Sequence, residues 1–398
     1  MNRNWVSPKT IIGPVATGKY YFPRKEIVSE IWFELGKGNY IILAAPRRVG
    51  KTSVMRDLEE NPEENYIVKF SSVQAIKSES EFYEHVYRLV LSCLSKTKKA
   101  KFWVSEYFKS KKITEVSFKN LSLKFGENSI DYLKEINDLF ENLDSNSETI
   151  VLLLDELPEV LYRLHKEGKT TEAKSILKQL RVWRQSNYNS LRFVFAGSVG
   201  IHYVVSAIEG RTSDLNDLNN VQCTPLSIES AQEFVEWTIK GASIQIKSEQ
   251  IEYLLNILKG YITPYFLNLI IDEIDKVAQK NNEPIVSNEK IDLAFQSNLK
   301  NLKHFNDWQK RLRDYMPDAD FKFVNEILTH IAHRDAIQIQ KIYDIAVNHD
   351  KTIDYMSFIF DLKEDGYIIE HSNDSQNYVF RSPVLRAFWK IINPIYHG

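Results

Sequence analysis

Residues 42–55, ILAAPRRVGKTSVM, constrain the fold of this 398-residue chain more than any other stretch. The apolar run Asn39–Ala45 comes first, and apolar side chains recur at helical spacing after Thr52. This pattern predicts a buried parallel strand, then a loop, then a short helix. In that order the pattern GxxxxGK[ST] has a physical meaning, because loop amides and a helix N-terminus can face an anion together.

The loop itself has the groups that nucleotide phosphates require. Lys51 would reach the β- and γ-phosphates, the Thr52 hydroxyl would ligate Mg²⁺, and loop amides would contact phosphate oxygens. Ala45 stands where the pattern asks for its first glycine, whereas Gly50 is retained beside Lys51. The alternative is a chance Gly-Lys-Thr in a surface turn. The candidate nucleotide-binding residues here are Pro46, Arg47, Arg48, Val49, Gly50, Lys51, Thr52 and Ser53.

A second apolar run, Ile150–Leu154, ends in two adjacent carboxylates, Asp155 and Glu156. Unpaired charge is costly to bury, and α/β sheets place their ligands at the carboxyl ends of strands. We therefore expect Asp155 to hold Mg²⁺ through water and Glu156 to orient and deprotonate an attacking water. The alternative is that both residues begin a solvated helix.

A third run, Leu191–Gly200, brings Ser198 to a strand tip, where it would contact the γ-phosphate or the attacking water; an ordinary Gly-rich turn explains it almost as well. Two further strands are expected, Tyr66–Ser72 and Val221–Ser227. Five short strands alternating with helical stretches predict an α/β fold with a mostly parallel sheet.

These segments, with GYITPYF and FRSPVLRAFW further on, resemble the bacterial and archaeal P-loop ATPases of the AAA+/STAND group, especially the archaeal-ATPase-like family. The resemblance runs from about Tyr20 to the end, apart from one long helical insertion. It implies an ATPase core of the ASCE/AAA+ type at 21–226 with the insertion at about 73–148. A helical lid at 227–306, a basic linker at 307–316 and a C-terminal winged helix at 317–398 would follow, and 1–20 would be an N-terminal extension.

The resemblance also implies roles for single residues. Arg24, in YFPRKEI, would lie near the nucleotide base, and Ser198 takes the first sensor position, where AAA+ proteins usually have Asn. No arginine of a second sensor is found at Lys259–Ile270; that stretch is closer to the GxP element of STAND proteins, in which Pro264 would pack near the adenine. A plain helix-start proline is the alternative for Pro264.

Hydrolysis can require an arginine that neutralises charge in the transition state. Arg211 is the first candidate, because it occupies a loop from which AAA+ subunits reach a neighbour's site. Arg184 is the second. A structural role on a solvated surface is the alternative for both.

The insertion has helical spacing at Ser80–Leu94 and again at Ser129–Leu143. Between them, Lys96–Lys112 has seven lysines, the single acid Glu106, and Phe102, Trp103, Tyr107 and Phe108. Lysines with aromatics could grip single-stranded nucleic acid; the favoured interpretation is a solvated helix face with an apolar underside. The basic stretch Lys300–Tyr315 fits a linker helix, a phosphate contact or a docking face equally well.

The tail 317–398 reads as three helices and a hairpin, the order of a winged helix, whose usual use is a recognition helix in the major groove. Its charge argues otherwise: eight Lys and Arg stand against twelve Asp and Glu, a net charge of −4. The expected recognition helix, Thr352–Lys363, has Asp354 and Asp361 against Lys363 alone. Duplex binding depends mainly on neutralised phosphates, so a protein-docking or regulatory module is favoured over a DNA-binding one.

Composition narrows the class of protein. The net charge of −2 gives no general reason to expect nucleic acid or a membrane as a partner. No signal peptide and no apolar run long enough to span a bilayer is found, so we expect a cytoplasmic protein. Cys93 and Cys223, each in an apolar segment, are expected to be buried free thiols.

The sequence thus predicts an ATP- and Mg²⁺-dependent ATPase acting as a molecular switch, whose nucleotide state controls self-assembly or engagement of a protein partner. The resemblance suggests a role in signalling or in defence against mobile elements. Two rival hypotheses stay open. One is a DNA-associated ATPase of the initiator or transposition-regulator type, with turnover stimulated by nucleic acid. The other is a nucleotide-binding scaffold that does not hydrolyse ATP.

Overall fold

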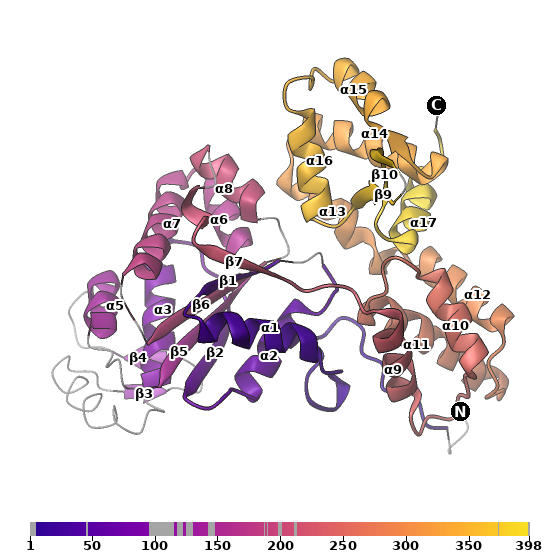
Figure 1. Ribbon diagram of the computed structural model, residues 1–398, viewed down its shortest axis with the longest axis horizontal. Helices are drawn as coiled ribbons and strands as arrows, with labels where there is room; N and C mark the ends of the chain where they lie inside the picture. The colour runs from indigo at the N-terminus through magenta and orange to yellow at the C-terminus, as the bar shows by residue number, and fades with distance from the viewer. Residues whose placement is uncertain are drawn as a thin grey trace. The chain divides into compact units, whose positions relative to one another are not determined.

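The computed structural model describes residues 5–44, 47–94, 115–117, 122–124, 130–141, 148–186, 188, 190–197, 201–210, 213–372 and 374–396. The chain forms two compact units (Figure 1). Unit 1 comprises 1–22, 45–50 and 224–398, and unit 2 comprises 23–44 and 51–223. The boundary therefore crosses the chain directly before Lys51.

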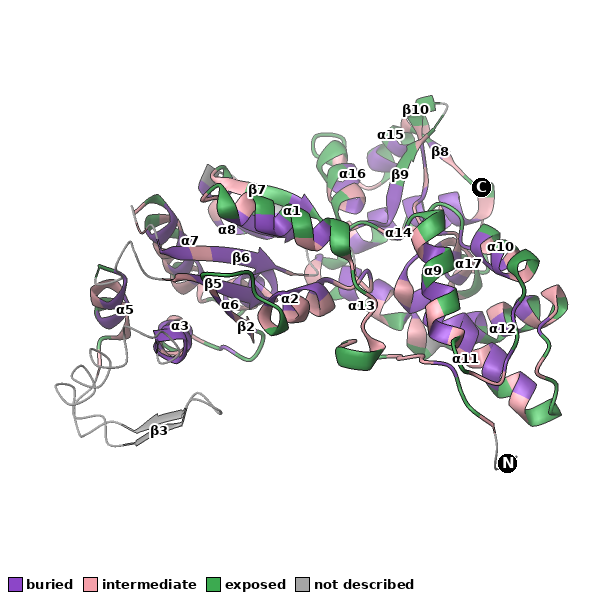
Figure 2. Ribbon diagram, turned by 60° about the horizontal axis from the view of Figure 1, so that its bottom comes forward, coloured by how far each residue is buried: buried purple, intermediate pink, exposed green. Residues whose placement is uncertain are grey.

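Unit 2 is built on a parallel five-stranded sheet in the order β2-β5-β6-β1-β7. The strands β5 and β6 consist mainly of residues with long apolar side chains. Both strands are buried on both faces, as a parallel sheet covered by helices requires. Figure 2 shows this contrast between the buried β5 and β6 and the partly exposed β7. The strands are β1 (Tyr40–Ala44), β2 (Tyr66–Ser72), β5 (Thr149–Asp155), β6 (Leu191–Ala196) and β7 (Leu218–Gln222).

Helices cover both faces of this sheet (Figure 1). One layer contains α1 (Lys25–Gly36) and α2 (Lys51–Glu60), which pack against each other. In the second layer α3 packs on α5 and α7, and α6, α7 and α8 pack on one another. These helices are α3 (Glu79–Leu94), α5 (Tyr132–Glu141), α6 (Leu157–Lys166), α7 (Thr170–Gln185) and α8 (Ile201–Glu209). The turn η2 (Ser213–Leu215) precedes β7. Right-handed crossovers place the connections on opposite faces because the chain reverses direction across the sheet at β2.

The five predicted strands are present, and the α/β prediction is confirmed, but two details differ. The last strand begins at Leu218, three residues before the expected Val221, because its partly exposed residues pair in register with β1. The sequence predicted an all-helical insertion, whereas β3 (Glu115–Ser117) and β4 (Ser122–Lys124) form an antiparallel pair within it.

The first part of unit 1 is helical, with α9 (Ile228–Ile239), α10 (Ser248–Ile257), α11 (Pro264–Asn281) and α12 (Asn288–Lys300). Serine or threonine side chains accept a backbone N–H at the starts of α9, α11 and α12, which satisfies donors that helix geometry leaves free. The N-terminal segment, with η1 (Gly18–Tyr20), packs here: the Trp5 indole donates to Asp275 (2.9 Å) and the Lys9 amide to the Thr238 carbonyl (2.9 Å).

After η3 (Leu302–His304) and α13 (Asn306–Tyr315), the remainder of unit 1 combines helices with a three-stranded antiparallel sheet in the order β8-β10-β9. Its helices are α14 (Asp318–Arg334), α15 (Ile339–Asn348), α16 (Tyr355–Glu364) and α17 (Pro383–Ile392). The strands are β8 (Ile337–Gln338), β9 (Ile368–His371) and β10 (Asp374–Phe380). None of the described helices is both long and apolar enough to cross a membrane.

Candidate functional site

The carboxyl end of the parallel sheet in unit 2 brings two of the predicted residues together. Thr52, in the first turn of α2, donates its hydroxyl to Asp155 Oδ2 at the end of β5 (2.7 Å). These residues are 103 positions apart in the sequence. They meet because β1 and β5 run parallel with only β6 between them, so both strands end at the same edge.

Lys51 and Asp155 are both buried at this edge. Burial raises the pKa of Asp155, whereas the hydrogen bond from Thr52 and the positive charge of Lys51 lower it. Burying opposite charges side by side offsets part of the cost of removing each from water. Lys51 and Asp155 therefore share this edge of the sheet, and the phosphate-binding role of Lys51 stays a prediction.

Glu156 follows Asp155 and adopts a left-handed backbone conformation, with φ of 64°. Such a conformation is uncommon for a residue other than glycine, asparagine or aspartate, and it is frequent at functional sites. Burial, together with hydrogen bonding to and repulsion from the neighbouring carboxyl group of Glu159, raises the pKa of Glu156 to about 8. A carboxyl group with this preference for a proton is suited to accept one from water.

Glu159 was not among the predicted site residues. It lies in the first turn of α6, is buried, and hydrogen bonds to Glu156. A sequence signal existed, because Glu156 and Glu159 are three positions apart at a helix start and therefore share one face. The pair forms only because the helix begins directly after β5, which the sequence left undecided.

Gly197 at the end of β6 allows the close approach of this helix. A Cβ atom at Gly197 would lie 2.5 Å from Pro158 Cδ and 2.9 Å from Glu159 Oε2. Both distances are below van der Waals contact. The absence of a side chain at Gly197 therefore fixes how closely the acidic turn packs on the sheet.

The loop before Lys51 contains two residues with a positive φ angle. Gly50 has φ of 108°, a region that favours glycine, and Val49 is fully buried. Arg48 also has a positive φ, 67°. Its guanidinium contacts Asp307 of α13 (3.0 Å) and lies over the Tyr265 ring of α11 (4.5 Å), while Arg47 lies 3.7 Å from the same Asp307 carboxylate oxygen.

Arg24 precedes α1 and lies in the electrostatic neighbourhood of Cys223, as does Lys51. Burial raises the pKa of the Cys223 thiol, and the two cations lower it by a smaller amount. Both cysteines are buried and free, as the sequence predicted. Ser53 lies in the first turn of α2.

Pro264 begins a helix, and Arg184 forms an ion pair within unit 2. Pro264 is the first residue of α11, after Thr263, whose hydroxyl caps the helix by accepting from the Phe266 amide (3.3 Å). Arg184 is buried and donates to both carboxylate oxygens of Asp217 (2.8 and 3.0 Å) and to the Asp214 carbonyl (2.7 Å). These contacts bind the helix α7 to the loop before β7. Ala45, Pro46, Ser198 and Arg211 lie outside the described residues.

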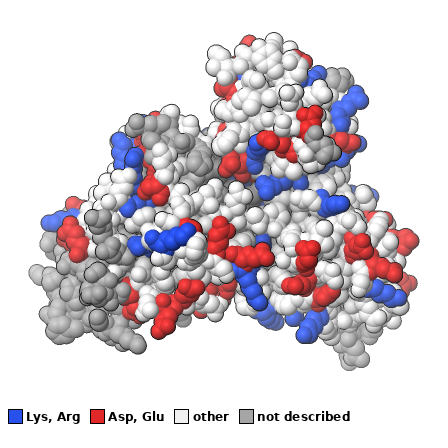
Figure 3. Space-filling model, in the orientation of Figure 1, with Lys and Arg blue, Asp and Glu red and all other residues white. Residues whose placement is uncertain are grey.

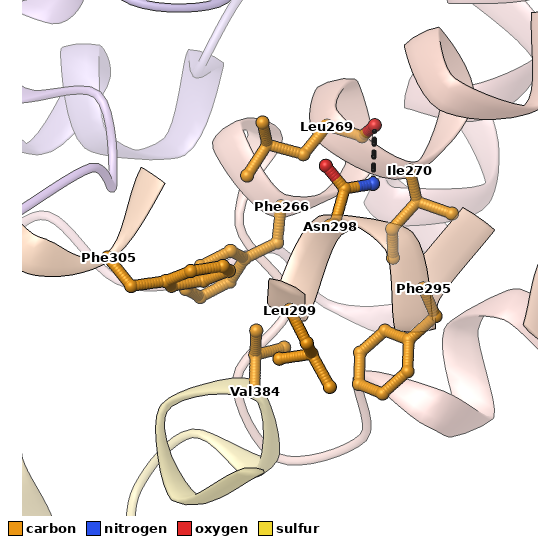
Figure 4. Close-up of a pocket in the computed structure, with 8 residues that line it drawn as sticks. All are labelled: Phe266, Leu269, Ile270, Phe295, Asn298, Leu299, Phe305 and Val384. Carbon is orange, nitrogen blue, oxygen red and sulfur yellow. Dashed lines mark hydrogen bonds between the residues drawn. The ribbon is translucent and has the colours of Figure 1, made fainter. Parts of the chain in front are cut away.

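Unit 1 contains a small cavity of about 10 Å³ between α11, α12 and α17 (Figure 4). Its lining is apolar except for Asn298, whose side-chain NH₂ donates to the carbonyls of Leu269 and Ala294 (both 3.0 Å). This volume is at the lower limit for one water molecule. The cavity is a packing gap in an apolar core, and it is too small for a nucleotide.

Comparison with solved structures identifies the fold. A Walker-type ATPase of Pyrococcus abyssi matches over 96% of this chain and 99% of its own, with a TM-score of 0.60 and 19% identity. The ORC2 protein of Aeropyrum pernix, solved as ADPNP–ADP complexes, matches over 99% and 97% with a TM-score of 0.48 and 11% identity. The RuvB Holliday junction branch migration motor of Thermotoga maritima matches over 92% of this chain and 94% of its own, with a TM-score of 0.44 and 10% identity.

No protein-family model and no curated protein matches the sequence. The first of these structures alone is similar enough to support a conclusion, and at 19% identity the conclusion concerns fold. The chain has the α/β fold of a Walker-type P-loop ATPase, and its five-stranded parallel sheet carries the phosphate-loop sequence at the end of β1.

Proposed function

We propose that this chain is an ATP-binding, Mg²⁺-dependent ATPase that works as a molecular switch. The observation that carries the proposal is the 2.7 Å hydrogen bond between Thr52 and the buried Asp155, directly beside the buried Lys51. A hydroxyl, a carboxylate and an ammonium group at the carboxyl edge of a parallel sheet match the requirements of a metal-bound phosphate chain.

The donor set fits Mg²⁺ and ATP. Mg²⁺ prefers hard oxygen ligands and usually takes one or two from the protein and others from phosphates and water. Thr52 and Asp155 would hold the ion, with Asp155 acting through water. When bound, the ion would neutralise charge on the phosphates. Lys51 and the loop residues Arg47–Ser53 would bind the phosphates through ammonium and amide groups, and Pro46 would extend this loop.

Hydrolysis then requires a general base that takes a proton from the attacking water. Glu156, held beside Glu159 in a strained turn, would orient the attacking water and accept its proton. Ser198 would sense the γ-phosphate, and Arg211 would neutralise transition-state charge from a neighbouring subunit. Arg24 and Pro264 would contact the adenine base of the nucleotide. The resemblance to AAA+/STAND proteins supports these four assignments.

The switch would act through the C-terminal region. We assign α14–α17 and their three-stranded sheet to a winged helix that engages protein rather than DNA, as its net negative charge favours. Nucleotide state would control self-assembly or binding of a protein effector, in a signalling or defence role. Two variants test the enzymatic part.

Lys51→Ala should weaken ATP binding by about 10- to 100-fold, the cost of losing a charge-assisted hydrogen bond to phosphate. Lys178→Ala, an exposed lysine on α7 of the same unit, is the matched control and should bind ATP normally. Titration calorimetry with ATP and Mg²⁺ measures both. Unchanged affinity in Lys51→Ala would contradict the assignment of the phosphate site.

Glu156→Gln should retain ATP affinity while turnover falls about 10²- to 10⁴-fold, the usual contribution of a general base. Glu60→Gln, on the exposed end of α2, should turn over at the normal rate. Phosphate release under saturating ATP measures this. Tight binding without turnover in the unsubstituted protein would favour the scaffold hypothesis.

A further inference from the structure

One face of unit 1 exposes apolar side chains on two adjacent helices. Tyr343 and Val347 lie one turn apart on α15, and Met356 and Phe360 lie one turn apart on α16. Between the helices, Ile353 is 100% exposed, and Phe360 is 52% exposed. We call Tyr343, Val347, Ile353, Met356 and Phe360 the α15–α16 patch. All five are exposed.

The patch is continuous across the two helices. The rings of Tyr343 and Tyr355 make an edge-to-face contact (5.7 Å between centroids), which joins the exposed side of α15 to that of α16. Figure 3 shows the surface over these helices as largely free of charge, with acidic and basic groups at its margin. Exposed aromatic and methionine side chains grouped in this way are typical of protein interfaces.

The rim of the patch is acidic. Residues 339–365 include six acidic residues and three lysines. Two of these lysines are engaged, Lys351 with Asp320 and Lys363 with Glu370. Four of the acidic residues are exposed, and among the described residues no lysine or arginine forms an ion pair with them: Asp344, Asp350, Asp354 and Glu364. A partner that covers the patch must therefore bring positive charge.

This combination disfavours duplex DNA as the occupant of the face, because Lys341 is the one lysine of 339–365 with no ion pair among the described residues. Binding to the phosphate backbone requires free lysines or arginines, and the two lysines near α16 are paired. The occupant must be apolar in its centre and basic at its edges. Such chemistry is that of an amphipathic, lysine-rich protein segment.

We propose that the α15–α16 patch binds the segment Lys96–Lys112 of a second copy of this chain. The proposal rests on the proposed function, because it gives the self-assembly of the switch a contact surface. The segment has seven lysines and one glutamate, and its centre holds Phe102, Trp103, Tyr107 and Phe108. Its aromatic residues match the apolar patch, and its terminal lysines match the acidic rim.

The geometry of such a contact is heterologous. One copy offers its segment and the next copy offers its patch, so the pair keeps one unused patch and one unused segment. A contact of this type continues into a ring or a filament. It also predicts that a copy lacking the patch and a copy lacking the segment still pair with each other once.

The direct test uses a synthetic peptide of residues 96–112 with blocked ends. The receptor is the full chain with Phe102, Trp103, Tyr107 and Phe108 replaced by serine, which removes competition from its own segment. Fluorescence anisotropy of the labelled peptide should show a Kd of about 1–100 μM that weakens with salt. Introducing Phe360→Asp into the receptor should weaken binding at least about tenfold, a loss of ~1.4 kcal/mol.

Two controls separate the patch from general charge attraction. Leu293→Asp changes an equally exposed apolar residue on α12 of the same unit and should leave peptide binding unchanged. A peptide with its four aromatic residues replaced by serine keeps every charge and should bind at least about tenfold more weakly. No peptide binding, or equal binding to the Phe360→Asp receptor, would overturn the proposal. Circular dichroism of each receptor confirms its folding.

Sedimentation velocity of mixtures gives the second readout. The Phe360→Asp chain alone and the serine-substituted chain alone should remain monomers, and an equimolar mixture should form a one-to-one pair. Binding of single-stranded DNA by the peptide with no pairing in the mixture would contradict the proposal in favour of a nucleic-acid partner for the segment. These measurements need no nucleotide. Lys51→Ala tests the ATP site separately, so failure of one proposal is distinguishable from failure of the other.

Discussion

Gly197 determines how closely the end of β6 approaches the acidic turn of α6. Replacing Gly197 by alanine would force its Cβ into Pro158 and Glu159, which must then move. We expect Gly197→Ala to destabilise the fold by about 1–3 kcal/mol, the usual cost of overpacking, and to lower turnover more than ATP affinity because Glu159 positions Glu156.

Thermal unfolding and phosphate release check the two effects of Gly197→Ala. Gly36→Ala is the matched control, because a Cβ at Gly36 would meet no atom within 4 Å. It should leave turnover unchanged. Normal melting and normal turnover in Gly197→Ala would show that α6 can shift without disturbing the acidic pair.

Asp361 makes the stability of unit 1 depend on pH. Burial, together with the negative charges of Asp365 and Glu364, raises the pKa of Asp361 to about 7. The folded state therefore favours the protonated form of Asp361. The stability that this protonated group contributes is fully present below the ordinary aspartate pKa of 3.8 and is lost as pH rises through about 7. Replacing Asp361 by asparagine removes the charge that folding disfavours.

Asp361→Asn should therefore be more stable than the unsubstituted chain by roughly 1–3 kcal/mol at pH 8, with the difference vanishing near pH 4. Denaturant unfolding across this pH range measures it. Asp354→Asn, an exposed position at the start of the same helix, is the matched control and should change the profile little. A constant difference at all pH values would point to packing rather than titration.

At the scale of elements, the phosphate loop has a connection that the sequence did not suggest. Arg48 and Arg47 both contact Asp307 at the start of α13, and Arg48 also lies over Tyr265. These side chains are partly exposed, so the ion pairs contribute about 0–1 kcal/mol to stability. Their larger effect concerns the loop, because a carboxylate that holds two arginines competes with phosphate for them.

Asp307→Asn should tighten ATP binding by roughly 2- to 10-fold at low salt, since it frees both arginines and removes a negative charge near the loop. Arg48→Gln should weaken it, and the double variant should show that the two changes are not additive. Asp318→Asn, an exposed aspartate at the start of α14, serves as the control. Titration calorimetry at two salt concentrations distinguishes this account from one in which Asp307 only stabilises α13.

The elements around the candidate site show what local sequence can and cannot predict. The proximity of Thr52 and Asp155 followed from two apolar runs and one rule, that parallel strands end at a common edge. The contact between Arg48 and Asp307 joins residues 259 positions apart and depends on packing that no local pattern encodes. Leu218 and Asn219 look like loop residues, and only their pairing with β1 makes them a strand.

At the scale of the whole molecule, the N-terminal residues illustrate the same limit. They were expected as an extension before the core, and the structure groups them with the helices of unit 1. Trp5 and Asp275 are 270 positions apart, and their hydrogen bond depends on the folded α11. The spacing of apolar residues in α15 and α16 likewise predicted helices correctly, but could not distinguish a buried face from an exposed one.

If the switch assembles through copies of itself, its catalysis should depend on its concentration. Arg211 of one subunit would complete the site of the next, so the ATPase rate per subunit should rise with protein concentration and then level off. Phe360→Asp should abolish this rise while leaving ATP affinity unchanged, because Phe360 lies on α16 and has no assigned contact with nucleotide. Leu293→Asp should retain the rise of the ATPase rate with protein concentration. Neither single- nor double-stranded DNA should raise the rate, because the proposed contact engages the lysines of 96–112 with protein. A rate that is independent of concentration but strongly stimulated by DNA would instead establish the DNA-associated hypothesis, with the lysines of 96–112 as the first residues to substitute.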